Sequence, residues 1–268
     1  MRCHHLVVAA LACVAMLGVH EAAAGSHPAR ITSLAGVPYR KVYLPGTNAL
    51  QEVCRLGQSG VPVGAVGDQS NGGTIFFGEG DTYWTYLELR PDSCAGCDAF
   101  YQATLDMAHL ALYFPFAPET LSVNVSVVGS VPIPCHYPNF SDPNAIICDS
   151  FGATLNCQDS LTTIDFAIGI PPGCGITALS QPNGQVVGTA FLGFEFTTAS
   201  DTTALNKPQI AVQASAKACV SFNPVGFIPY DFVSEYTVGN PVMYAEVLRC
   251  DNVAVRRSTW GRLKMQYR

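Results

Sequence analysis

The sequence predicts an all-β fold: an antiparallel β-sandwich, jelly-roll-like, with turns clipped by disulfides. Three observations lead to this expectation. Only 13% of the residues are charged, while glycine (24) and proline (18) are abundant, as suits pleated strands joined by turns. Several segments alternate apolar and polar residues with a period of two. Nine cysteines follow an N-terminal segment that has the features of a secretory leader.

The leader is residues 1–24. Arg2 precedes an apolar run at residues 6–19, which is too short to span a bilayer, and an A-x-A cleavage signal ends at Ala24. An uncleaved anchor and a lipoprotein modified at Cys13 fit these features less well. We therefore expect cleavage after Ala24, which removes 24 of the 268 residues and leaves 244. The expected location is secreted, either extracellular or in the cell envelope.

The mature chain divides into a single domain at residues 25–250 and a basic tail at residues 251–268. The tail holds five basic residues and one acidic residue, a net charge of +4. Because the whole chain has a net charge of −6, residues 25–250 carry −10. This acidic body excludes nucleic acid as a partner. No further apolar stretch approaches transmembrane length, so we expect no membrane span in the mature chain. The tail is either a frayed terminus or a surface-sorting or lipid-contacting segment.

In the first half, strands are expected at 37–44, 61–66, 74–78, 82–90 and 100–114, with a loose terminus at 25–34 and a helical turn at 50–56. The clearest strand, residues 120–129, turns four apolar side chains to one face: Leu121, Val123, Val125 and Val127. A proline-rich loop follows at 132–143.

In the second half, further strands are expected at 161–170, 186–198, 209–222 and 242–250. Ile164, Phe166 and Ile168 share one face of the first of these, and Leu192, Phe194 and Phe196 share one face of the second. About nine or ten strands result. No long helix alternates with them, which argues against a parallel α/β sheet.

The cysteines of the mature chain are expected to form disulfides, because the compartment is oxidising. They are Cys54, Cys94, Cys97, Cys135, Cys148, Cys157, Cys174, Cys219 and Cys250. Nine is an odd number, so at least one remains outside an intrachain disulfide. The sequence does not choose among the pairings, although Cys94–Cys97 and Cys148–Cys157 are plausible short clips. A redox dithiol or half of a zinc site is the alternative for Cys94 and Cys97, which lie between strand-like runs without the helix or second cysteine pair that those sites need.

The strand at residues 82–90 offers the best candidate for ligand binding. Alternation sends Trp84, Tyr86, Glu88 and Arg90 to one side, where flat aromatic rings and charges together could hold a sugar ring or a partner protein. The alternative is that a loop simply covers Trp84.

Two acidic, glycine-rich turns supply oxygen atoms of the kind that calcium prefers. They contain Asp68, Asn71, Glu79 and Asp81. No EF-hand spacing is present, and ordinary Asx turns explain these residues more simply. Calcium is the one cofactor considered.

Catalytic signals are few. No GxSxG or HExxH motif occurs, and only His27, His109 and His136 follow the leader. Asp106 and His109 lie three residues apart, so on a strand they face opposite sides. Two sequons, at Asn124 and Asn139, have meaning only in a eukaryotic secretory route.

The layout resembles uncharacterised secreted β-sandwich proteins of bacteria. The resemblance is carried by LSVNVSVVGS, by IPPGCGITA followed by TAFLGFEF, by NPVMYAEV and by the TWGRLK tail. It implies export and an all-β fold, without an activity or a site. We therefore expect a non-catalytic secreted protein that binds a ligand, a carbohydrate or a surface protein, through its aromatic strand face. The alternatives are a structural cell-surface or envelope protein and a hydrolase with a carboxylate pair.

Overall fold

The computed structural model describes residues 29–44, 54–68, 80–90, 93, 94, 97, 100–115, 119–132, 135–139, 142, 145–157, 162–170, 174–180, 186–197, 208–225 and 228–252. The predicted leader, the strand expected at 74–78 and all but the first two residues of the basic tail lie outside these ranges. Within them the chain is all-β, which confirms the predicted class. The one helix among these residues is the short α2 (Phe232–Tyr236), and none of the described helical structure is long and apolar enough to span a membrane.

The strands in chain order are β1 (Ala29–Ser33), β2 (Tyr39–Tyr43), β3 (Cys54–Gln58), β4 (Pro62–Asp68), β5 (Thr82–Leu89), β6 (Phe100–Phe114), β7 (Glu119–Val128), β8 (Ser130–Pro132), β9 (His136–Pro138), β10 (Ile146–Cys157), β11 (Thr162–Gly169), β12 (Gly175–Ser180), β13 (Val186–Phe196), β14 (Gln209–Gln213), β15 (Ser221–Val225), β16 (Ile228–Asp231) and β17 (Met243–Asn252).

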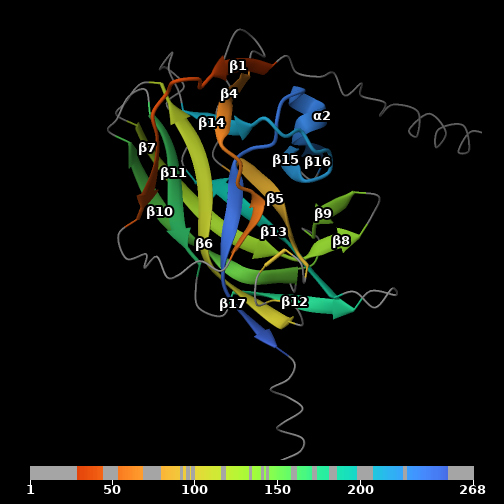
Figure 1. Ribbon diagram of the computed structural model, residues 1–268. Coiled ribbons are helices and arrows are strands. Elements are labelled where there is room, and N and C mark those ends of the chain that lie inside the picture. Colours follow the sequence, from red (N-terminus) through yellow and green to blue (C-terminus); the bar gives the residue numbers. More distant parts are fainter. Residues whose placement is uncertain are drawn as a thin grey trace, which may run out of the picture.

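Two groups of strands share one apolar core. The first group contains β2, β11, β6, β17 and β3 as neighbours, with β14, β4 and β1 joined to it through β6. Figure 1 shows β11, β6 and β17 of this group running side by side. The second group runs β10, β7, β13, β5, β15 and β16. Strand β12 pairs with β6 and with β13, so both groups belong to one 15-stranded sheet.

All the strand pairs are antiparallel except one. Strand β2 lies parallel to β11, and β11 is its partner among the described strands. The two-stranded β8–β9 hairpin forms a small sheet of its own (Figure 1). The antiparallel all-β prediction is therefore confirmed, while the sandwich arrangement and its jelly-roll order stay predictions.

The core contains the apolar faces that the alternation predicts. The alternating apolar residues of β7, β11 and β13 are all in the main core cluster, together with Leu110 of β6 and Met243 of β17. The polar side of β11 differs from the expectation, because Thr163 and Asp165 are also buried. This strand is therefore covered on both faces, and its outer face holds the candidate site.

Several local predictions are wrong. The single strand expected at 209–222 is two strands, β14 and β15, separated by residues 214–220, and β12 and β16 were not expected. Residues 29–33 of the expected loose terminus form β1, which pairs with β4, and the described end of the expected helical turn belongs to β3. The proline-rich loop expected at 132–143 contains β9 and the last residue of β8. The sequence analysis also missed β10, where two register shifts against β7 disrupt the period of two.

Four disulfides are present, as expected for an oxidising compartment: Cys54–Cys94, Cys97–Cys250, Cys135–Cys219 and Cys148–Cys174. The two predicted short clips are wrong. Cys94 and Cys97 instead join the turn after β5 to the neighbouring strands β3 and β17 of the other group, which fastens the two groups together. Cys157, which is buried, is the cysteine outside these four pairs.

Candidate functional site

The candidate site lies on the outer face of β2, β11, β6, β17 and β3. On β6, His109 stands between Ala108 and Leu110, both of which enter the core, so its side chain points to the opposite face. Asp165 on β11 and Tyr244 on β17 point outward by the same alternation. The register then brings these residues together, because Tyr244 lies directly opposite His109, and β11 flanks β6 on its other side.

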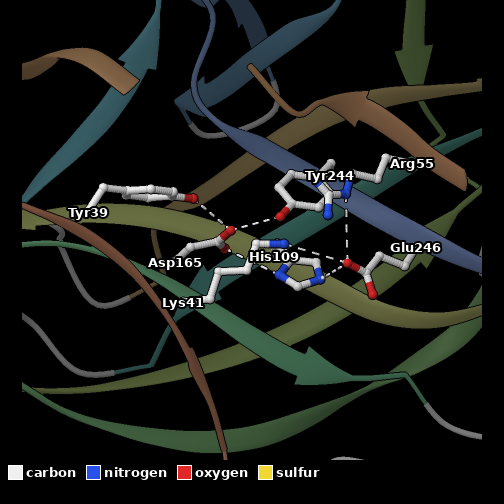
Figure 2. Close-up of polar contacts among 7 residues, drawn as sticks. All are labelled: Tyr39, Lys41, Arg55, His109, Asp165, Tyr244 and Glu246. Carbon is white, nitrogen blue, oxygen red and sulfur yellow. Dashed lines mark hydrogen bonds and ion pairs between the residues drawn. The ribbon is translucent and has the colours of Figure 1, made fainter. Parts of the chain in front are cut away.

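His109 lies between two carboxylates. Its Nδ1 is 3.4 Å from Oδ1 of Asp165, and its Nε2 is 3.0 Å from Oε1 of Glu246 (Figure 2). Both are ion-pair distances, although neither contact is aligned as a linear hydrogen bond. The imidazole and the Asp165 carboxylate are completely buried, and Glu246 is nearly so.

Two tyrosines fix the second oxygen of Asp165. The hydroxyl of Tyr39 donates to Oδ2 at 2.9 Å, and the hydroxyl of Tyr244 donates to the same atom at 2.8 Å. Figure 2 shows both hydroxyls converging on this carboxylate. The ring of Tyr244 also stacks on the imidazole of His109, with 4.4 Å between centroids and 10° between planes. The phenols therefore hold Asp165 in place while Tyr244 covers one side of His109.

Two basic side chains complete the network. Nζ of Lys41 and Nε of Arg55 lie 3.7 Å and 3.9 Å from Oε1 of Glu246, and both cations sit over the Tyr244 ring at 5.3 Å and 5.2 Å. Arg55 faces Glu246 across the β3–β17 pair. Lys41 comes from β2, which β11 and β6 separate from β17, so its side chain extends across the site to reach Glu246 (Figure 2).

The contacts of His109 with the two carboxylates favour the ionised form of all three groups. Burial alone would lower the pKa of His109, but the contacts with Asp165 and Glu246 outweigh burial and raise it. Burial would raise the pKa values of both carboxyl groups, and their contacts with His109 lower them instead. Burial and the charge of Asp165 raise the pKa values of Tyr39 and Tyr244, so both phenols remain protonated as donors.

The charges are separated by depth. His109, Lys41 and Arg55 lie around the two carboxylates, with His109 between them. The Asp165 and Glu246 side chains are 0% and 7% exposed, whereas those of Lys41 and Arg55 are 26% and 38% exposed. The two carboxylates are therefore internal, and the charged ends of Lys41 and Arg55 reach the solvent.

The geometry argues against acid–base catalysis at this site. The imidazole ring fills the space between Asp165 and Glu246, where a glycosidase needs room for a sugar or a water molecule. A general base must also reach its substrate within hydrogen-bonding distance, and His109 has no exposed side-chain surface. Among the described residues, no group of three or more His, Cys, Asp or Glu side chains is arranged to hold a metal ion.

The strand face predicted for binding is partly covered. Its alternation is as expected, but Trp84 is only 6% exposed and packs with Val128, Phe191 and Phe222. Tyr86 is half-buried and stacks on His136 of β9 at 4.8 Å between centroids, and its burial, with the charge of Glu88, raises its pKa to about 12.

The charged pair at the end of this strand reaches the surface. Glu88 and Arg90 form an ion pair at 2.8 Å with each other. Tyr86, Glu88 and Arg90 therefore reach the surface at least in part, whereas the Trp84 ring is covered and offers no open surface to a ligand. Their role in binding stays a prediction.

The calcium candidates give little structural information. Asn71 and Glu79, with the side chain of Asp68, lie outside the described residues. The backbone carbonyl of Asp81, the residue before β5, accepts a hydrogen bond from the amide of Phe196 at the end of β13. Calcium binding stays a prediction.

Sequence reasoning considered His109 only with Asp106, and it missed the partners. Asp165 and Glu246 lie on strands far away in the sequence, and only the pairing of β11 and β17 with β6 brings them to one imidazole. The available signal was charged residues inside otherwise apolar strands, AHLAL, IDFAI and MYAEV. A polar group at such a position requires a buried partner.

Comparison with known proteins gives no further assignment. No protein family, curated protein or solved structure was found that matches the chain.

Proposed function

We propose that the protein is a secreted, non-catalytic β-sandwich module that binds carbohydrate through the exposed side chains of β2 and β3, which flank the buried His109 network. The observation that carries this proposal is the buried His109 network, which fixes a row of partly exposed tyrosine and basic side chains on one face of the sheet. The resemblance to secreted bacterial β-sandwich proteins and the four disulfides support export.

A stable fold does not require a buried network of charged groups. Apolar residues of similar volume often replace a buried ion pair with no loss of stability, so burying one histidine and two carboxylates suggests a role beyond folding. The network holds the Tyr39 ring through its hydroxyl, and it holds the cations of Lys41 and Arg55 above Tyr244. Such prearranged side chains lose little conformational entropy when a ligand binds.

The exposed groups suit a sugar better than a protein partner. Tyr39 and Tyr43 are 42% and 44% exposed, and they are the large exposed apolar or aromatic residues described on the five strands of the candidate site. The exposed aliphatic side chains of Ile31, Val61 and Leu179 lie elsewhere. A protein interface normally has an apolar centre, whereas tyrosine rings with polar neighbours can stack on a sugar ring and bond its hydroxyl groups.

Glycan-array binding tests this proposal. The wild-type protein is expected to bind, and the double substitution Tyr39→Ala with Tyr43→Ala is expected to lose binding at least tenfold. Leu179→Ala is the control, because it removes another large exposed side chain, which lies on β12. If no glycan binds, or if the two variants bind equally well, the proposal is wrong.

A further inference from the structure

The β8–β9 hairpin covers an aromatic surface of the second group of strands. Its two strands pair with each other and with no other described strand, and Figure 1 shows them beside β5 and β13. The cluster beside the hairpin consists of Trp84, Val128, Phe191 and Phe222, and Trp84 is only 6% exposed. The hairpin therefore hides this surface without being part of the sheet that carries it.

The hairpin touches the surface through aromatic rings. His136 stacks on Tyr86 with 4.8 Å between centroids, and Tyr137 packs against Phe222 with 5.0 Å between centroids. Ring pairs of this kind are individually weak. Since the hairpin shares no ladder of backbone hydrogen bonds with β5 or β13, these ring contacts can be separated without disrupting the larger sheet.

The hairpin is fastened at its base and at its tip. At the base, the amide of Gly129 donates to the carbonyl of Ala145 at 2.7 Å, and the amide of Asn139 donates to the carbonyl of Gly129 at 2.9 Å. At the tip, Cys135 directly precedes β9 and forms a disulfide with Cys219. The base bonds keep the hairpin attached, and the disulfide holds its tip over the aromatic surface.

This disulfide is the one of the four in which both cysteines are partly exposed. Cys135 and Cys219 are both only partly buried. Each of the other three disulfides has a cysteine that is almost inaccessible, because Cys94, Cys97 and Cys174 are 3%, 0% and 2% exposed. A thiolate must reach a sulfur atom to open a disulfide, so we expect Cys135–Cys219 to be reduced first.

The Cys219 side of the bond is a fixed anchor. Its backbone has a φ of +64°, in the left-handed region that a residue with a Cβ rarely adopts, and its amide donates to Oδ1 of Asp231 at 3.0 Å. The buried side chain of Asn240 accepts from the amide of Lys217 at 2.7 Å and donates to its carbonyl at 2.9 Å. Loss of the disulfide therefore leaves this loop in place and releases the tip of the hairpin.

We propose that the Cys135–Cys219 disulfide is a redox latch, which a dithiol reductant opens so that the hairpin swings away and uncovers Trp84 and Tyr86. A thiolate of the reductant attacks one sulfur to form a mixed disulfide, which its second thiol then resolves. Two electrons and two protons pass to the protein, so the reductant leaves as a disulfide and both cysteines become thiols. The uncovered strand is the one that the sequence predicts for ligand binding. It is separate from β2 and β3, so the inference goes beyond the proposed function.

Alkylation mapping and tryptophan fluorescence test the latch. Every protein carries Trp260→Phe, which leaves Trp84 as the only tryptophan. In dithiothreitol with iodoacetamide trapping, Cys135 and Cys219 should be labelled at least tenfold faster than the other paired cysteines. As they are labelled, the acrylamide quenching constant of Trp84 should rise at least threefold, while the far-ultraviolet circular dichroism of the β-sheet is retained.

Two further samples complete the test. The Cys135→Ser, Cys219→Asn protein should show the raised quenching without reductant, and asparagine is used because it tolerates a left-handed backbone. Oxidised dithiothreitol is the control, because it cannot supply electrons and should leave the quenching unchanged. Earlier labelling of another disulfide overturns the latch, and so does unchanged quenching of Trp84 after Cys135 and Cys219 are labelled. Loss of the circular dichroism signal together with this bond also overturns it, because the disulfide would then hold the fold itself.

Discussion

Replacing His109 with leucine is expected to destabilise the fold strongly. The substitution keeps a side chain of similar size and leaves Asp165 and Glu246 buried without the charge between them. Breaking a buried ion pair by removing one partner costs about 3–5 kcal/mol. Asp165 keeps two phenol hydrogen bonds and Glu246 keeps two basic neighbours, so we expect the lower end, about 3 kcal/mol.

The effect of His109→Leu also depends on pH. Because the folded-state pKa of His109 is raised above its unfolded value near 6.5, its contribution to stability is fully present below about pH 6.5. That contribution is lost as the pH rises through the folded-state pKa. The wild-type protein should therefore become less stable as the solution becomes more alkaline, and the variant should lack this part of the pH dependence.

Urea unfolding monitored by circular dichroism, with the disulfides intact, measures both effects. At pH 6 the variant should lose about 3 kcal/mol, which corresponds to a Tm lower by about 6–12 °C for a domain of this size. His136→Leu is the control, since His136 stacks on Tyr86 instead of lying between carboxylates. A loss below about 1 kcal/mol at pH 6, or an equal loss in the two variants, would refute the charged network.

Three further predictions concern other parts of the structure. Tyr39→Phe removes a donor to Asp165, so it should cost about 1 kcal/mol. The folded-state pKa of Asp165 should then rise. A carboxyl group with a lowered pKa loses its contribution to stability as the pH falls through that pKa, so acid unfolding of the variant should begin at a higher pH. An unchanged midpoint of acid unfolding would contradict this. Non-reducing peptide mapping should find Cys97–Cys250, and replacing both cysteines by serine should cost about 5 kcal/mol for this long loop, whereas recovery of a Cys94–Cys97 peptide would contradict the assignment. Gly193→Ala places a Cβ within 2.6 Å of the Trp84 indole, so the ring must move, with a cost of about 1–3 kcal/mol and altered tryptophan fluorescence; an unchanged spectrum would contradict the packing.

The period of two predicted the core well, because each alternating strand packs one face on the same interior. The inward side chains of β7 and β13 are examples. The prediction failed where alternation is broken by register shifts, as in β10, and where a strand is short, as in β1. The disulfides could not be predicted from spacing, because Cys94 and Cys97 each reach a strand that is near only in the folded chain.

The candidate site depended on the same long-range information. The sequence predicts that Asp165 lies on the solvent-exposed face of β11, because nothing local indicates that this face is also covered. For Trp84 the sequence left open whether the ring is exposed or covered by a loop, and the covered alternative is the one observed, because the β8–β9 hairpin contributes Tyr137 and Cys135 to the cluster around it. In both cases the sequence indicated which face a side chain occupies, and tertiary packing decided whether that face is open.

Hydrogen exchange measured by mass spectrometry, with and without a glycan that binds on the array, tests the central claim most directly. The account predicts that the glycan slows exchange in residues 39–43 of β2 and 54–58 of β3, which flank the His109 network. Residues 82–89 of β5 should be unchanged. Protection confined to β5 and the β8–β9 hairpin, with β2 and β3 unaffected, would contradict the claim and place binding at Tyr86, Glu88 and Arg90 instead.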